Sequence, residues 1–183
     1  MHAMETGEQP PTFQRNDTHD PRTQQSAARM TRGPIQLDVA VSYGLPRVGL
    51  PASTSFRRWV AAALEGRILR ADLAIRLVDE REGQCLNRHY RGKPHATNVL
   101  SFPAELPKGV KLPLLGDIVL CAPVIESEAR EQRKPLAAHY AHLTVHGVLH
   151  LLGFDHNVAR DADAMEKIER EILAGLGLPD PYA

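Results

Sequence analysis

Alternating apolar and polar residues mark the first regular segment of the chain. Residues 35–41 place apolar side chains at every second position, which predicts a strand with one buried face. Short apolar runs predict further strands over 74–78, in the second half of 91–103 (ended by Pro103) and over 115–121. The short link between the last two contains Gly and Pro, and we therefore predict that they form an antiparallel hairpin.

Apolar residues at helical spacing predict the helices. One runs through 56–64 with Ser53 or Thr54 as its N-cap, and a short one covers 80–91 and ends at Gly92. Residues 124–134 predict a charged surface helix. A long helix follows with Pro135 in its first turn, and it is apolar nearly all round, which indicates that it is buried.

The last predicted helix starts at Asp161 as its cap. Its inward positions are apolar, and its end is marked by helix breakers; the residues concerned are Met165, Ile168, Ile172 and Leu173, then Gly175, Gly177 and Pro179. Strands dominate the first half of the chain and helices the second. This order predicts an α+β fold, a small mixed β-sheet packed by helices.

Residues 1–33 have no apolar periodicity and are rich in Gln, Thr, Asp, Arg and Pro. They cannot bury enough surface to offset the entropy of ordering, so we predict a disordered tail followed by a single domain over 34–183. A transit peptide is a weaker alternative, because four acidic residues fall in this stretch: Glu5, Glu8, Asp17 and Asp20.

Charge and composition exclude several classes of protein. Basic and acidic residues balance at 22 each, so any affinity for nucleic acid has to come from a local patch. No apolar run approaches the roughly 20 residues of a membrane span, and no secretory signal is present. Cys85 and Cys121 form no disulfide pattern, which favours a reducing cytoplasm.

Candidate chemistry lies in the run H-G-V-L-H-L-L-G-F-D-H, residues 146–156. His146 and His150 are four apart on the predicted buried helix, so their imidazoles can share one ion. Gly153 can end the helix and turn the chain, which brings His156 back as a third ligand. Three imidazoles leave one position of a tetrahedral ion open, as in a catalytic site for a single Zn²⁺.

The same histidine frame occurs in metzincin peptidases, but Gly147 stands where those enzymes carry their general-base Glu. The frame therefore favours the metal and argues against peptide hydrolysis by that mechanism. Chance spacing of hydrogen-bonded core histidines is the plain alternative. His139 and His142 share the stripe, and we expect them to support the ligands, to cap the helix or to lie on the surface.

Three stretches together resemble the YbeY family of bacterial endoribonucleases: 146–156, 86–91 with 97–103, and 116–118. The resemblance runs in order over about residues 35–178. Asn98 stands where many members have Asp, and Phe154 where Tyr is frequent. The tail lies outside the pattern.

This resemblance implies a single-strand-specific, metal-dependent endoribonuclease that acts in the maturation of the 3′ end of small-subunit ribosomal RNA and in ribosome quality control. It implies that His146, His150 and His156 bind zinc, and that Arg91 is the functional arginine of an RNA-binding groove. The expected partners are single-stranded RNA, including rRNA, and the small ribosomal subunit or its proteins. Neither DNA nor a membrane is expected.

The residues themselves agree with an RNA substrate. Arg91, with Arg88 and Lys93 nearby and no acid between 88 and 95, can hold a phosphate and stabilise developing charge. A solvated helix end is the alternative for Arg91. Asp155 is either a general base or a residue that orients a ligand histidine. Two other functions stay open: a metallohydrolase such as a peptidase, and a non-catalytic ribosome-assembly factor with a structural metal.

Overall fold

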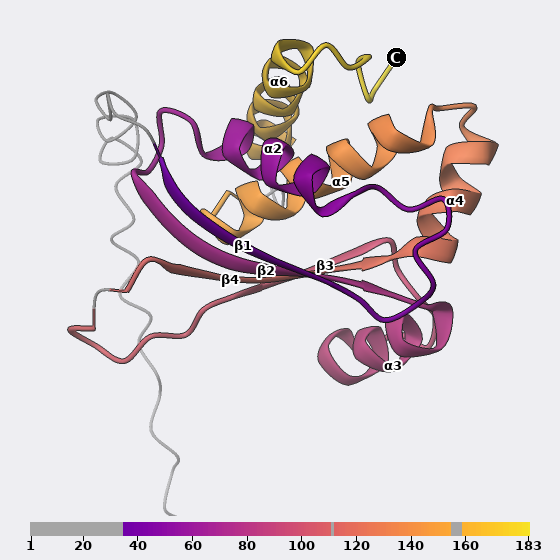
Figure 1. Ribbon diagram of the computed structural model, residues 1–183, viewed down its shortest axis with the longest axis horizontal. Coiled ribbons are helices and arrows are strands. Elements are labelled where there is room, and N and C mark those ends of the chain that lie inside the picture. The colour runs from indigo at the N-terminus through magenta and orange to yellow at the C-terminus, as the bar shows by residue number, and fades with distance from the viewer. Residues whose placement is uncertain (1–34, 111, 155–158) are drawn as a thin grey trace, which may run out of the picture.

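The computed structural model describes residues 35–110, 112–154 and 159–183 (Figure 1). This part of the chain forms a four-stranded sheet of order β1-β2-β4-β3. The strands are β1 (Gln36–Tyr43), β2 (Arg70–Val78), β3 (Val99–Pro103) and β4 (Leu114–Cys121). The helices are α2 (Ser53–Leu64), α3 (Glu80–Arg91), α4 (Ala122–Glu131), α5 (Leu136–Leu151) and α6 (Ala159–Gly175).

The sheet is mixed, as predicted for an α+β fold. Strands β1, β2 and β4 run parallel, while β3 pairs antiparallel with β4, which confirms the predicted hairpin. Helix α2 connects β1 to β2, because parallel neighbours need a crossover connection. Strand β3 is left at one edge of the sheet, and the candidate site lies beside this edge.

Helices α2, α5 and α6 lie over one face of the sheet, and α3 lies on the other (Figure 1). Successive side chains of a strand point to opposite faces of the sheet, so each strand contributes to the packing on both faces. In β4, Ile118 and Leu120 point into the main core, whereas Val119 and Cys121 belong to a smaller cluster. Helix α5 is buried on most sides, as its sequence predicts, and places Val148 and Leu149 in the main core.

Some predicted boundaries were wrong. The N-cap of α2 is Ala52, without a side-chain cap, since Ser53 is already helical. Helix α6 begins before Asp161, which therefore lies in the first turn, where a negative charge favours the helix dipole. Pro135 is the N-cap of α5. Helix α4 starts two residues before Val124 and has a buried face of Ala122, Ile125 and Ala129.

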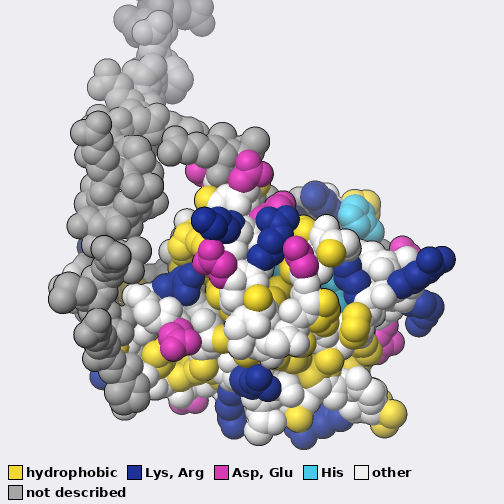
Figure 2. Space-filling model, turned by 90° about the horizontal axis from the view of Figure 1, so that it is seen from above, with side chains coloured by type: hydrophobic (Ala, Val, Ile, Leu, Met, Phe, Trp, Pro, Cys, Tyr) yellow, Lys and Arg dark blue, Asp and Glu magenta, His cyan; other side chains and the backbone are white. Residues whose placement is uncertain are grey.

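The tail predicted to be disordered, residues 1–33, lies outside the described residues, and its separation from a single domain over 34–183 stays a prediction. On the face that carries α2 and α6, basic and acidic side chains are interspersed (Figure 2). Within the described ranges, no helix is long and apolar enough to cross a membrane.

Candidate metal centre and adjoining groove

Four histidines form a stripe along α5: His139, His142, His146 and His150. Their spacing of three or four residues places them on one side of the helix. Successive ring centroids are 6.3, 6.2 and 4.6 Å apart, so the rings come closest at the C-terminal end, between His146 and His150. The stripe passes from buried His139 to partly exposed His150.

The end of α5 has the geometry that the sequence predicts. Gly153 adopts a left-handed conformation with φ of 87°. Its N–H donates to the carbonyl of His150, and that of Phe154 donates to the carbonyl of Leu149. This pair of bonds is a Schellman motif, which turns the chain away from the helix axis. His156 and Asp155, which follow this turn, lie outside the described residues.

The Nε2 atoms of His146 and His150 lie 3.1 Å apart. Two imidazole nitrogens that bind one tetrahedral zinc ion at 2.0–2.1 Å lie roughly 3.3 Å from each other. The pair therefore fits an ion without any change of backbone. Both side chains are partly exposed, so an ion bound there can reach solvent and substrate.

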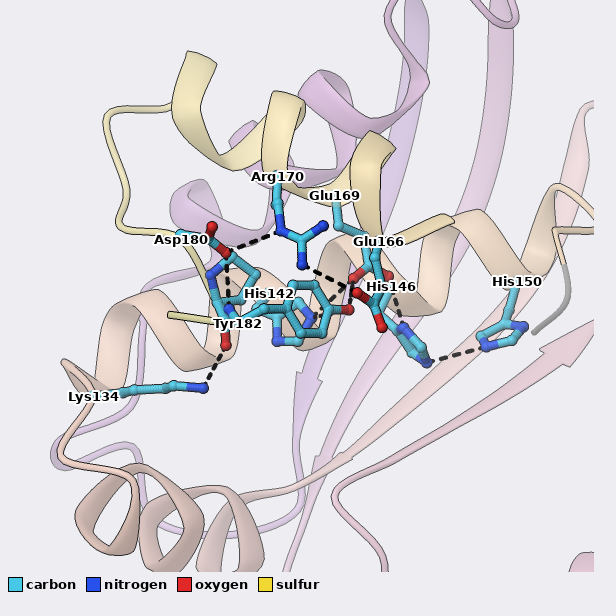
Figure 3. Close-up of polar contacts among 10 residues, drawn as sticks. Lys134, His142, His146, His150, Glu166, Glu169, Arg170, Asp180 and Tyr182 are labelled. Carbon is cyan, nitrogen blue, oxygen red and sulfur yellow. Dashed lines mark hydrogen bonds and ion pairs between the residues drawn. The ribbon is translucent and has the colours of Figure 1, made fainter. Parts of the chain in front are cut away.

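Glu169 of α6 is completely buried. It lies on the side of the His146 ring that faces away from His150 (Figure 3). Its Oε1 is 2.8 Å from Nδ1 of His146, and its Oε2 is 3.0 Å from Nε2 of His142. The hydroxyl of Tyr182 also donates to Oε2. Burial raises the pKa of Glu169, but the hydrogen bonds from His142, His146 and Tyr182 outweigh it and lower the pKa to about 2. Glu169 is therefore an ionised carboxylate.

His142, His146 and Glu169 also form a second possible metal site, because one ligand atom from each lies within 4.8 Å of the others. In the structure, however, hydrogen bonds already join these three side chains. The described residues thus offer two places for an ion, one on either side of the His146 ring.

An open groove runs from this centre to the edge strand β3 and the end of α3. Its described lining contains two cations and no carboxylate. The residues that matter for charge and for ligation are Arg91, Lys93, His95, Asn98, His146 and His150. The structure therefore brings Arg91 and Lys93 into the same groove as the histidine pair, while Arg88 does not line it.

Hydrogen bonds fix the wall of the groove. Gly92 caps α3 in a left-handed conformation directly after Arg91. The buried side chain of Asn87 donates to the carbonyl of His95 at 2.6 Å and ties the following loop to α3. The amide of Asn98 donates to Glu128, which also accepts from Nε2 of His139 at 2.8 Å. The loop is thus connected to α5 through α4.

Gly147 packs directly against the sheet. A Cβ at this position would come within 3.1 Å of both Cδ1 of Ile118 and Oγ of Ser101. The Ser101 hydroxyl also donates to the carbonyl of Gly147. A side chain at position 147 would therefore point at the sheet and crowd Ile118 and Ser101, which is not the placement that a general-base Glu needs.

The model of the family described as Endoribonuclease YbeY matches residues 51–177. The chain belongs to the YbeY family. Endoribonuclease YbeY of Stenotrophomonas maltophilia K279a is 73% identical over 84% of this chain and 98% of its own. The protein of the same name from Xanthomonas oryzae pv. oryzae MAFF 311018 is 72% identical over the same shares. The resemblance inferred from the sequence is thus confirmed.

A solved structure shows the same fold. The solution structure of a Thermotoga maritima protein aligns with a TM-score of 0.52 at 24% identity, over 78% of this chain and 97% of that protein. At this identity the match supports the fold alone, and it agrees with the mixed sheet and helices of this YbeY-family chain.

Sequence reasoning missed two residues of the centre. The sequence does contain an indication of Glu169, because this residue lies on the inward stripe of α6 between Met165 and Leu173. A carboxylate at a buried position rarely lacks a partner. The sequence contains no such indication of Tyr182, because it follows Gly and Pro residues without any periodic pattern. His142, expected to support the ligands, to cap the helix or to lie on the surface, bonds to Glu169.

Proposed function

We propose that this protein is a single-strand-specific, zinc-dependent endoribonuclease that processes small-subunit ribosomal RNA in the cytoplasm. Its YbeY-family membership supports RNA cleavage. The observation that carries the zinc site is the pair of Nε2 atoms, His146 and His150, that face each other 3.1 Å apart in a groove lined by Arg91 and Lys93.

His146, His150 and His156 would hold the ion. The side of His146 that faces His150 is favoured over the side that faces Glu169, because the oxygens of Glu169 already accept three hydrogen bonds. When bound, zinc supplies a Lewis acid for a phosphoryl oxygen and lowers the pKa of a coordinated water. A site with three protein ligands keeps a position open for this chemistry.

Arg91 is placed to bind the scissile phosphate. It is the last residue of α3, exposed at the mouth of the groove, and its guanidinium can donate two parallel hydrogen bonds to a phosphate. Lys93 adds a second positive charge. No carboxylate of the described lining opposes the polyanion, so the groove favours a nucleic-acid backbone even though the whole chain is neutral.

RNA brings its own nucleophile, the 2′-hydroxyl, so an enzyme without the peptidase Glu can still cleave it. An amide substrate needs an activated water and a base, and position 147 cannot supply the base. This favours RNA over peptides. The ribosomal RNA and small-subunit proteins remain the proposed partners on the strength of the family.

The test is cleavage of a single-stranded rRNA fragment by the purified full chain, with a duplex and a casein substrate in parallel. We expect cleavage of the single strand only, its loss with a chelator and its return with zinc. His150→Ala should lower the rate by at least about 100-fold, whereas His89→Ala, an exposed histidine outside the groove, should not.

Casein hydrolysis without RNA cleavage would contradict the proposal. So would an active His150→Ala variant. If His150→Ala instead unfolds the protein and the wild type cleaves nothing, the metal is structural. The result would then support the alternative hypothesis, a non-catalytic ribosome-assembly factor.

A further inference from the structure

Glu169 is a junction between the metal centre and the C-terminal end of the chain. Its side chain is fully buried, yet it is the acceptor for three groups from two segments: His146 and His142 of α5, and Tyr182 (Figure 3). A buried carboxylate is stable only when its oxygens are satisfied in this way.

The bond to Glu169 orients the His146 ring. Oε1 of Glu169 lies 2.8 Å from Nδ1 of His146, so this nitrogen faces α6, and Nε2 on the other side of the ring faces His150. Nε2 is the atom that would bind the ion. Carboxylates that bond to the distal nitrogen of a ligand histidine also hold the plane of its ring.

The C-terminal strap, Asp180–Tyr182, is itself anchored. Lys134 donates to the carbonyl of Pro181, and Arg170 pairs with Asp180 at 3.4 Å. The guanidinium of Arg170 also lies 4.7 Å from the centre of the Tyr182 ring. These contacts keep the Tyr182 hydroxyl on Oε2 of Glu169, which leaves Oε1 directed at His146.

We propose that Glu169 and the C-terminal strap are positioning elements for the metal ligand His146, so that the last residues of the chain set the affinity of the centre. The inference rests on the proposed function only in taking His146 as a zinc ligand. Neither Glu169 nor Tyr182 binds the ion in this account.

The test measures the zinc dissociation constant of the full chain by competition with a chromophoric chelator, and the melting temperature of the metal-free protein. Glu169→Gln replaces one acceptor oxygen by an amide that donates, and we expect the dissociation constant to rise about 10- to 100-fold. Tyr182→Phe removes one hydroxyl and keeps the ring, and we expect a rise of about fivefold.

Two controls match these variants. Glu171→Gln changes an exposed carboxylate of the same helix that is not among the anchors of the strap named above. Tyr43→Phe removes a hydroxyl that donates to Pro51. Both should bind zinc like the wild type. His150→Ala should abolish binding, while His142→Ala should weaken it by less than about tenfold, because the centre keeps all its ligands.

Wild-type affinity in Tyr182→Phe and Glu169→Gln overturns the proposal. If Glu169→Gln does not fold, Tyr182→Phe alone decides, since its metal-free melting temperature reports separately on folding. Loss of binding in His142→Ala with binding kept in His150→Ala also overturns it, because Glu169 is then a ligand. A wild type that binds zinc but cleaves no RNA defeats the proposed function and leaves this inference standing.

Discussion

Among single residues, the side chains proposed to bind the ion and the side chain proposed to bind the substrate lie on different elements. His146 and His150 face each other across the site, and Arg91 lies on a different element in the same groove. A change at Arg91 should therefore affect catalysis without affecting the metal.

Arg91→Ala should lower kcat/KM for single-stranded RNA by about 100-fold or more, because charge that develops on the phosphate loses its donor. Arg91→Lys should recover only part of this, since an ammonium cannot bind a phosphate bidentately. Zinc affinity should stay unchanged in both. Arg81→Ala, at an exposed position of α3 outside the groove, is the control; equal losses in Arg81→Ala and Arg91→Ala would contradict the assignment.

Glu128 provides a test by pH. Burial raises its pKa, but hydrogen bonds from His139 and Asn98 outweigh burial and hold the pKa below the ordinary 4.5. A depressed pKa contributes stability above about pH 4.5 that is lost as the pH falls through the folded value. Glu128→Gln should lower the free energy of unfolding at pH 7 by about 1 to 2 kcal/mol.

This deficit should shrink as the pH falls below 4.5, as measured by urea unfolding at several pH values. Glu131→Gln, which removes the charge of an exposed acceptor for the Ser127 hydroxyl, should cost little at any pH. A deficit for Glu128→Gln that is constant down to pH 3 would show that the charge of Glu128 does not stabilise the fold.

The histidine pair and the turn at Gly153 could be predicted at this scale because helical spacing alone decides them. The junction at Glu169 could be suspected only from its inward position on α6. Tyr182 could not be predicted, because its contacts join residues 13 and 40 positions apart through tertiary packing.

At the scale of elements, the hairpin of β3 and β4 forms the edge that borders the groove. Gly116 permits this pairing. Its φ is +135°, and a Cβ would lie 2.1 Å from the carbonyl oxygen of Phe102 and 2.9 Å from the nitrogen of Ala104. Both are backbone atoms that cannot move without breaking the pairing with β4.

Gly116→Ala should therefore destabilise the protein by more than about 3 kcal/mol, from backbone strain and steric overlap together. Gly109→Ala is the matched control, since Gly109 also has a positive φ, of 89°, but no atom of the described residues within 4 Å of the added Cβ. It should cost about 1 to 2 kcal/mol. Chemical denaturation measures both, and equal losses would show that strain alone accounts for Gly116.

Most elements could be predicted from apolar periodicity, including α3 to its last residue and the burial of α5. The errors fell at the ends of elements. Strand β2 begins at Arg70, before the predicted start at residue 74, and α4 ends at Glu131, before the predicted end at residue 134. Caps were also misplaced, because one residue of helical or extended backbone decides such a boundary. The order of the strands could not be predicted, because the parallel pairing of β2 with β4 depends on contacts that no local pattern records.

At the scale of the whole molecule, the fold brings three distant segments to one centre. Helix α5 supplies His146 and His150. Glu169 of α6, which accepts from Tyr182 of the C-terminal strap, bonds to His146 on the side away from the groove. The end of α3 places Arg91 in the groove itself. The neutral net charge of the chain is compatible with an RNA substrate because the positive charge is local.

In the proposed site, the ion lies between His146 and His150 and not between His146 and Glu169. Anomalous diffraction at the zinc edge, from crystals of the zinc-loaded full chain, measures this directly. We expect one strong peak roughly 2.1 Å from the Nε2 atoms of both His146 and His150, with His156 as the third protein ligand. A peak bound by His142, His146 and Glu169, or an ion enclosed by four protein atoms, would contradict it.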